Sequence, residues 1–310
     1  MKRGLIYIAL AAVSWGVGGF VAALLYRHSG LGPIAVTFWR YLGGLALLAA
    51  LLRKRPKRRL LNGLGMALYQ TAYYVAIELG GVGIVTVVTL GSGPILIALA
   101  ERTFRQHIRI LAAALLGLVL LVAQNPQTGP HPLAGILVAL VSAAGYAGVT
   151  IHNRVKNDDP YDSALGGFAV GTVALLPLAA LEGLAPRAEG IGVTLGLLVF
   201  LGAVPTALAY ALFFKGLTVI RATTASVVAL SEPLAAVALG ALVLHEPLTV
   251  WSAAGGLLLL GSVAALALQE RPGREDRAGD EGRNGPQPPV RRGRRRMFRS
   301  PNRRRGRALR

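Results

Sequence analysis

Glu232 and Pro233 are the most informative pair of residues in the chain, because both stand inside a long apolar stretch, residues 223–249. A proline inside a helix removes one backbone donor and leaves the carbonyl four residues earlier, here that of Ala229, without its helical partner. Lipid cannot satisfy that carbonyl, and a carboxylate at bilayer depth usually faces a cavity or a partner group. The pair therefore predicts a polar interior. A weaker copy of the stretch surrounds Pro94.

Glu232 and Arg40 are charged side chains inside predicted apolar segments. Glu232 has two interpretations: it binds a proton or a substrate amine, or it is a structural residue paired with a hydroxyl or with Arg40. Arg40 lies seven residues after Pro33 in the second apolar segment, about 10 Å from the outer end at about 1.5 Å per residue. Its alternatives are an ion pair with Glu78 or Glu232, binding of a substrate carboxylate, and extension toward the interface.

Polar and aromatic side chains inside other apolar segments are candidates for a substrate cavity. Tyr69 and Tyr73 are one helical turn apart and share a face, and Gln70 and Tyr74 form the adjacent stripe. These four lie in mid-segment, so cavity lining and core packing are the alternatives to an interfacial aromatic belt. The substrate-binding candidates are Trp15, Tyr69, Gln70, Tyr73, Tyr74, Ser92, Tyr146, Tyr210 and Ser231.

Pro94 and Pro233 are candidate hinges, because a proline within a helix bends or breaks it. Ser92 and Ser231 precede these prolines by two residues. Each serine hydroxyl has an alternative role, which is to satisfy backbone groups that the proline leaves free.

The composition indicates the class of protein. Of the 310 residues, 54% are hydrophobic and 15% are charged, whereas about a quarter of the residues of a soluble protein are charged. Apolar segments of about 20 residues, enough to cross about 30 Å of hydrocarbon, alternate with short charged connectors. We therefore predict an all-α polytopic membrane protein. Its ten transmembrane helices are expected at residues 4–26, 33–52, 61–79, 82–101, 109–124, 132–152, 162–181, 191–214, 222–244 and 249–268. Nine or eleven spans are the alternatives, because the fifth segment is short.

The distribution of Lys and Arg over the short connectors predicts the orientation. With the N-terminus in the cytoplasm, the cytoplasmic connectors hold nearly all of these residues, including six between residues 53 and 59. The outer connectors then hold only Arg27 and Arg187. An even number of spans places both termini in the cytoplasm, in a multi-pass protein of the cell membrane.

Ten spans divide into two sets of five. An alignment of Pro94 with Pro233, an offset of 233 − 94 = 139, also sets Ser92 on Ser231. A five-helix repeat inserts with opposite orientations in its two copies, and such inverted repeats are typical of transporters that bind substrate near the midplane. The expected domains are a first repeat at 1–126, a second repeat at 131–269 and a disordered, Arg-rich cytoplasmic tail at 270–310.

The tail is expected to associate with anionic lipid of the inner leaflet. Charge alone would also allow nucleic-acid binding, but the tail has no aromatic interleaving and no folded module, so we expect none. The chain has no cysteine, which excludes disulfides and Cys-based metal sites. It also lacks the HExxH and GxxxxGK[ST] patterns, and we expect neither a cofactor nor ATP as the energy source.

Four sequence features resemble one family. They are Ser14-Trp15-Gly16, Phe38-Trp39-Arg40, the TLGSGPILIALAE of the fourth segment and the LSEPLAAVALGALVLHEPLT of the ninth. Together they resemble the EamA-type transporters of the drug/metabolite transporter superfamily, over residues 1–270 and most specifically at Leu230–Thr249. The resemblance implies ten helices in two inverted five-helix repeats, and secondary carriers that often export amino acids or other small metabolites. The chain departs from the pattern where the family's Glu after the fourth span aligns with His107, although Glu101 lies nearby.

The expected function is secondary active transport, namely export of small metabolites such as amino acids or drug-like compounds across the plasma membrane by alternating access. The alternatives are an intramembrane enzyme and a non-transporting scaffold. Gly91-Ser92-Gly93 invites comparison with rhomboid-type serine proteases, but Leu90 stands where that motif needs glycine. The five histidines lie near segment ends rather than at the midplane. We therefore expect a small-molecule substrate and no enzymatic activity.

Overall fold

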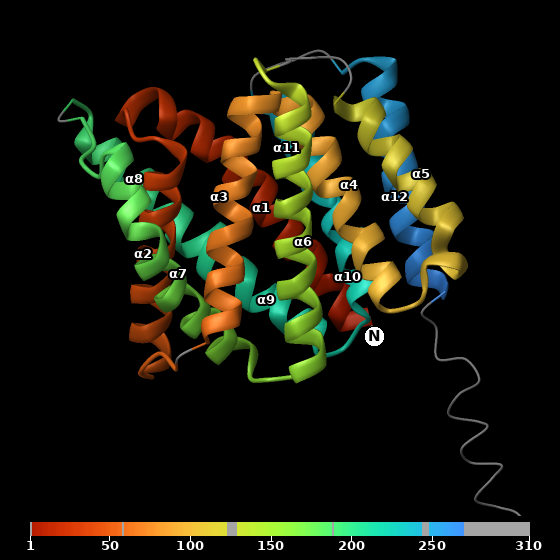
Figure 1. The fold of residues 1–310 in the computed structure, drawn as a ribbon, viewed down its shortest axis with the longest axis horizontal. Coiled ribbons are helices and arrows are strands. Elements are labelled where there is room, and N and C mark those ends of the chain that lie inside the picture. The colour runs from red at the N-terminus through yellow and green to blue at the C-terminus, as the bar shows by residue number, and fades with distance from the viewer. Residues whose placement is uncertain (1, 58, 123–128, 188, 244–247, 270–310) are drawn as a thin grey trace, which may run out of the picture. The chain divides into compact units, whose positions relative to one another are not determined.

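A computed structural model describes residues 2–57, 59–122, 129–187, 189–243 and 248–269. All regular secondary structure in these residues is helical, as the sequence predicts (Figure 1). The predicted tail, residues 270–310, and the second Glu-Pro pair of the ninth segment, Glu246-Pro247, lie outside the described residues.

The chain forms its helices close to the predicted positions. Those of the first half are α1 (Lys2–Ser29), α2 (Pro33–Leu52), α3 (Leu60–Gly80), α4 (Val82–Ala100) and α5 (Phe104–Val122). Those of the second half are α6 (Pro132–Lys156), α7 (Pro160–Glu182), α8 (Ile191–Gly202), the π-helical η1 (Ala203–Leu208), α9 (Ala209–Leu217), α10 (Ala222–Ala229), α11 (Ser231–Val243) and α12 (Val250–Gln269). Because α8, η1 and α9 form one span and α10 and α11 another, the described helices make up ten spans.

Nine spans among the described residues are long and apolar enough to cross a membrane. The tenth is α3, which has 21 residues and a more polar sequence, since it carries Gln70, Glu78 and three tyrosines. A polar helix is stable at membrane depth when its polar side chains face protein or a cavity. The composition of α3 therefore already points to a polar interior.

The two prolines that the sequence aligns have different effects on their helices. The ninth span is broken at Leu230, three residues before Pro233, where the Leu230 amide donates to the carbonyl of Val227 in a tight turn. In contrast, α4 continues through Pro94 without a break. A proline costs one backbone hydrogen bond and bends a helix, but neighbouring helices can hold the helix together across it.

Helices of the two halves pack against each other in a repeated pattern. Helix α2 packs on α7. Helix α5 packs on α12, and this second pair lies at one edge of the bundle (Figure 1). Helix α6 packs on α3 and α4, and α1 packs in the same way on the α8–α9 and α10–α11 spans. Each half therefore places its first helix against the third and fourth spans of the other half, as a pair of equivalent five-helix units would.

Glycine allows some of these helices to approach very closely. A Cβ atom on Gly117 of α5 would lie 2.8 Å from the carbonyl oxygen of Gly255 on α12. On α1, a Cβ atom on Gly16 would lie 2.6 Å from the carbonyl oxygen of Glu232. Small residues at helix interfaces let backbones touch in membranes, where packing replaces the hydrophobic effect as the driving force. The Gly16 contact places α1 directly against the first turn of α11.

Candidate functional site

A cavity of about 440 Å³ lies inside the bundle. Its wall is formed by residues of α1, α2, α3, α4, α6, α9, α10 and α11, together with Leu230 at the helix break. Both halves of the chain contribute, as expected for a site at a repeat interface. The sequence-predicted residues on the wall are Trp15, Arg40, Tyr69, Gln70, Tyr73, Tyr74, Pro94, Tyr146, Tyr210 and Glu232.

Ser92, Ser231 and Pro233 are not part of this wall. On α4, Leu90 and Pro94 face the cavity and are separated by about one helical turn. Ser92 lies midway between them in sequence and so points to the opposite side of the helix. The expectation that Ser92 and Ser231 contact substrate is therefore not supported by their positions.

Four polar wall residues were not predicted from the sequence: Tyr26, Thr89, Ser142 and Ser226. Ser142 stands one helical turn before Tyr146, and this spacing already places the two side chains on one face of α6. Tyr26 coincided with the predicted end of the first span, whereas α1 continues to Ser29. Ser142 could therefore have been predicted as a wall residue from its helical spacing to Tyr146.

The floor of the cavity is aromatic. The hydroxyls of Tyr69 and Tyr210 are hydrogen-bonded to each other, which links α3 to α9. The ring of Trp15 packs edge-on against that of Tyr210, with a centroid separation of 5.2 Å. Ser142 Oγ donates to the carbonyl of Tyr69 at 2.7 Å and ties α6 to the same group. The side chains of Trp15, Tyr69, Tyr146 and Tyr210 thus belong to one contact group drawn from both halves.

Two charged side chains reach this aromatic cavity. Glu232 and Arg40 both line it, but Arg40 forms no ion pair among the described residues. Its guanidinium Nε instead donates to Thr206 Oγ1 at 3.2 Å. Glu78, the other expected partner, is exposed on α3. Of the alternatives for Arg40, an ion pair with Glu78 or Glu232 is not formed among the described residues, and one cation and one carboxylate lie on the same cavity wall.

The cavity extends toward one end of the bundle. We call the end where α1 meets α2 the Gly30 end, and the opposite end, where α2 meets α3, the Lys57 end. The wall positions of α1 lie between Trp15 and Tyr26, in the half of that helix nearer the Gly30 end. Those of α3 and α4 reach the Gly30 end at Ile77 and Val82 and continue past mid-helix to Tyr69 and Pro94, and Gly19 and Ala23 are exposed on the α1 side of the wall. The wall therefore extends to the Gly30 end of the bundle at Tyr26 and Val82.

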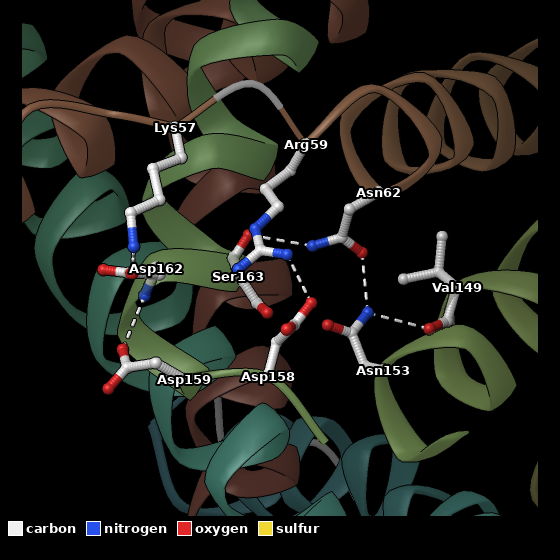
Figure 2. A network of polar contacts seen from close by, with 9 residues as sticks. All are labelled: Lys57, Arg59, Asn62, Val149, Asn153, Asp158, Asp159, Asp162 and Ser163. Atoms are coloured by element: carbon white, nitrogen blue, oxygen red, sulfur yellow. Dashed lines mark hydrogen bonds and ion pairs between the residues drawn. The ribbon is translucent and has the colours of Figure 1, made fainter. Parts of the chain in front are cut away.

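At the Lys57 end, a group of polar contacts joins helices of the two halves, and we call it the polar cluster (Figure 2). It consists of Lys57, Arg59, Asn62, Asn153, Asp158, Asp162 and Ser163. Lys57 Nζ lies 2.7 Å from Asp162 Oδ2, and Arg59 pairs with Asp158. Because the Lys57 side chain is 69% exposed, water screens its ion pair strongly.

The buried part of the polar cluster is formed by two asparagines. Asn62 of α3 donates from Nδ2 to the carbonyl of Ser163 on α7 at 2.8 Å. Asn153 of α6 donates from Nδ2 to Asn62 Oδ1 at 2.6 Å. Both side chains are buried, so these bonds have little competition from water. They join a helix of the first half to two helices of the second half (Figure 2).

A second contact between the halves lies near the Lys57 end. Glu101, directly after α4, accepts hydrogen bonds from the backbone amides of Ala222 and Thr223 and from Thr223 Oγ1. These amides belong to the first turn of α10, where a carboxylate satisfies free donors and complements the helix dipole. Thr103 Oγ1 also bonds Thr223 Oγ1 at 3.1 Å. Glu101 therefore fixes the start of the helix that leads to Glu232.

A ten-span bundle of two equivalent halves, with a cavity between them, is the architecture of a membrane transporter. The model of the EamA-like transporter family matches the chain twice, at residues 2–123 and 133–268. The chain therefore belongs to the EamA-like transporter family, and each match covers five spans. Five spans per copy give the two copies opposite orientations.

Relatives of the chain bear transporter names. The uncharacterized transporter YwfM of Bacillus subtilis (strain 168) is 31% identical over 83% of this chain and 91% of its own length. An uncharacterized transporter of Archaeoglobus fulgidus is 29% identical over 85% of this chain and 96% of its own. A solved crystal structure matches with a TM-score of 0.73 at 20% identity, over 86% of this chain and 98% of the other, which supports the fold. Family and relatives indicate a multi-pass membrane transporter rather than an enzyme.

Proposed function

We propose that the protein is a secondary active exporter of small metabolites across the plasma membrane, working by alternating access. The observation that carries this proposal is the cavity of about 440 Å³, whose wall extends to one end of the bundle, with polar contacts between the two halves at the opposite end. A carrier that exposes its site to one side at a time needs such an asymmetry. A scaffold has no need of it.

The wall of the cavity favours substrates such as amino acids or aromatic drug-like compounds. The volume lies in the range of sites for small organic molecules, about 300–1,000 Å³. Arg40 offers charge-assisted donors to a carboxylate, and Glu232 accepts from an ammonium group. The aromatic floor around Tyr69 and Tyr210 provides apolar area and stacking partners for the remainder of the molecule.

The orientation follows from the cationic connectors. The Lys57 end carries Arg53, Lys54, Arg55, Lys57 and Arg59, whereas the Gly30 end has few cations. By the positive-inside rule the Lys57 end faces the cytoplasm, with both termini. In this orientation we propose that the described state is open toward the outside, where the cavity wall reaches the end of the bundle, and is held closed toward the cytoplasm by the polar cluster.

Glu232 is the proposed coupling group. It is the carboxylate on the cavity wall, and the break at Leu230 and Pro233 lies beside it, so a change in its charge acts where the helix can bend. Protonation from outside and release inside would couple proton entry to export.

The test begins with an untargeted comparison of metabolites in the medium of cells with and without the protein. The compound that accumulates is then followed into inverted vesicles under an imposed pH gradient. Glu232→Gln should abolish the dependence of transport on that gradient, while the matched control Glu78→Gln, which removes an exposed carboxylate, should retain it. Unchanged gradient dependence in Glu232→Gln would remove this residue as the coupling site.

A further inference from the structure

The eighth span changes its backbone hydrogen-bonding pattern in η1, residues 203–208. Pro205 has no amide hydrogen, so the carbonyl of Leu201, four residues earlier, lacks its helical donor. Thr206 Oγ1 donates to this carbonyl at 2.7 Å. Wider turns of this kind within α-helices occur frequently at functional sites.

The Thr206 hydroxyl has a second partner on another helix. It gives its single proton to Leu201, so its lone pairs remain to accept, and Arg40 Nε donates to it at 3.2 Å. Thr206 is completely buried, which leaves the hydroxyl no competing water. The direction of the Arg40 guanidinium is therefore set by the irregular backbone of η1.

Close packing of α2 on this span makes the contact feasible. Gly44 stands one helical turn after Arg40, and a Cβ atom there would lie 2.9 Å from Thr206 Cγ2. On the neighbouring position, a Cβ atom of Gly43 would lie 3.5 Å from the Cα of Gly202. Two consecutive glycines thus bring the backbone of α2 against the eighth span and place Arg40 within reach of Thr206.

Arg40 retains donors for a ligand. A guanidinium carries five N–H groups, and one of them is used by Thr206. Among the described residues no carboxylate pairs with Arg40, although it lines the cavity at membrane depth. An arginine in this position is stabilised by an anion or by cavity water.

We propose that Thr206 is a positioning residue that directs the Arg40 guanidinium into the cavity, where it binds a carboxylate or another anionic oxygen group of the substrate. This inference rests on the proposed transport function and adds to it the residue that orients Arg40 toward the substrate. Without the hydroxyl, Arg40 keeps its charge but loses its fixed direction, and its flexible side chain turns toward the interface.

The chain contains no cysteine, so one introduced thiol reports on the cavity without background. Ala23 lines the cavity and is exposed, and Ala23→Cys is a small change. The purified full-length protein is treated with two methanethiosulfonate reagents, one carrying a sulfonate and one a trimethylammonium group. The ratio of the two reaction rates measures the electrostatic potential in the cavity and needs no knowledge of the substrate.

In the Ala23→Cys background, Arg40→Gln should lower the anionic-to-cationic rate ratio about tenfold or more, because it removes from the cavity wall a unit charge that attracts one reagent and repels the other. Thr206→Val, which preserves shape and removes the hydroxyl, should lower the ratio at least about threefold, and Thr206→Ser should restore it. The melting temperature of each variant is measured in parallel, because loss of packing alone would change stability and not charge selectivity.

A ratio in Thr206→Val equal to that of the parent would overturn the positioning role, and so would a failure of Thr206→Ser to restore it. If Arg40→Gln leaves the ratio unchanged, the guanidinium does not face the cavity and the inference is equally wrong. Absence of transport in the metabolite and vesicle experiments would instead refute the proposed function. The two outcomes are distinguishable because the rate ratios are measured without a transport assay.

Discussion

Replacement of Asn62 by alanine tests whether the polar cluster holds the Lys57 end closed. Asn62 is buried on α3 and makes one hydrogen bond to Ser163 of α7 and another to Asn153 of α6. Asn62→Ala removes both bonds and leaves Asn153 with its bond to the carbonyl of Val149 in its own helix. The change therefore acts on contacts between helices and spares those within them.

The expected effect follows from burial. A typical intramolecular hydrogen bond contributes about 1 kcal/mol net, and a buried partner left unsatisfied costs about 1–3 kcal/mol. With two bonds lost, the closed state should be destabilised by about 2 kcal/mol relative to a state in which water reaches the cluster. A difference of 1.4 kcal/mol is a factor of ten, so the open population should rise about thirtyfold. The exposed Lys57 ion pair would contribute less, because water screens it.

A thiol at Thr150 measures this opening. Thr150 is completely buried on α6, between Tyr146 of the cavity floor and Asn153 of the polar cluster. Thr150→Cys is nearly isosteric, and a membrane-impermeant thiol reagent should reach it from the Lys57 side only when the polar cluster opens. In inverted vesicles, Asn62→Ala should raise the reaction rate of this thiol about thirtyfold, in proportion to the open population.

A matched control removes a buried hydrogen bond elsewhere. Ser262 Oγ bonds the carbonyl of Leu258 within α12, and Ser262→Ala should leave the rate at Thr150→Cys unchanged. The reasoning is refuted if Asn62→Ala reacts at the parental rate, or if the rate rises equally when the reagent is added from the Gly30 side.

Three further changes have calculable outcomes. Gly16→Ala should lower the free energy of unfolding by about 1–3 kcal/mol, because its Cβ would lie 2.6 Å from the carbonyl oxygen of Glu232. Gly19→Ala is the control on the same helix, because no atom lies within 4 Å of a Cβ there. It should leave the free energy of unfolding unchanged or raise it by up to about 1 kcal/mol. Equal melting temperatures for the two variants would contradict the packing argument. Glu101→Gln should cost about 1 kcal/mol, since it weakens the cap at Thr223, and hydrogen exchange at the start of α10 should accelerate; unchanged exchange there would show that the cap is dispensable.

The number and positions of the helices could be predicted from the sequence because they depend on local properties. An apolar run of about 20 residues crosses a bilayer wherever it stands in the chain. All ten predicted segments correspond to spans, with ends that differ by a few residues. The family could be predicted for a related reason, since each of its motifs is a contiguous stretch of sequence. Glu232 and Arg40 were likewise visible as charges inside apolar segments, and both line the cavity.

Which side of a helix meets which neighbour was decided by the tertiary structure. Ser92 and Ser231 stand beside aligned prolines, yet neither reaches the cavity, and only the span of Pro233 is broken. Arg40 has Thr206 as its partner, 166 residues away, through an irregular turn that local propensity does not predict.

Glu232-Pro233 therefore marked a polar interior from the sequence by itself, because a carboxylate and a missing amide donor cannot both be left in lipid. The shape of that interior depended on contacts between distant residues. Asn62 and Asn153 are 91 positions apart, and they pair because α3 and α6 pack together. Tyr69 and Tyr210 form the cavity floor across 141 positions for the same reason, namely that packing of whole helices brings their side chains together.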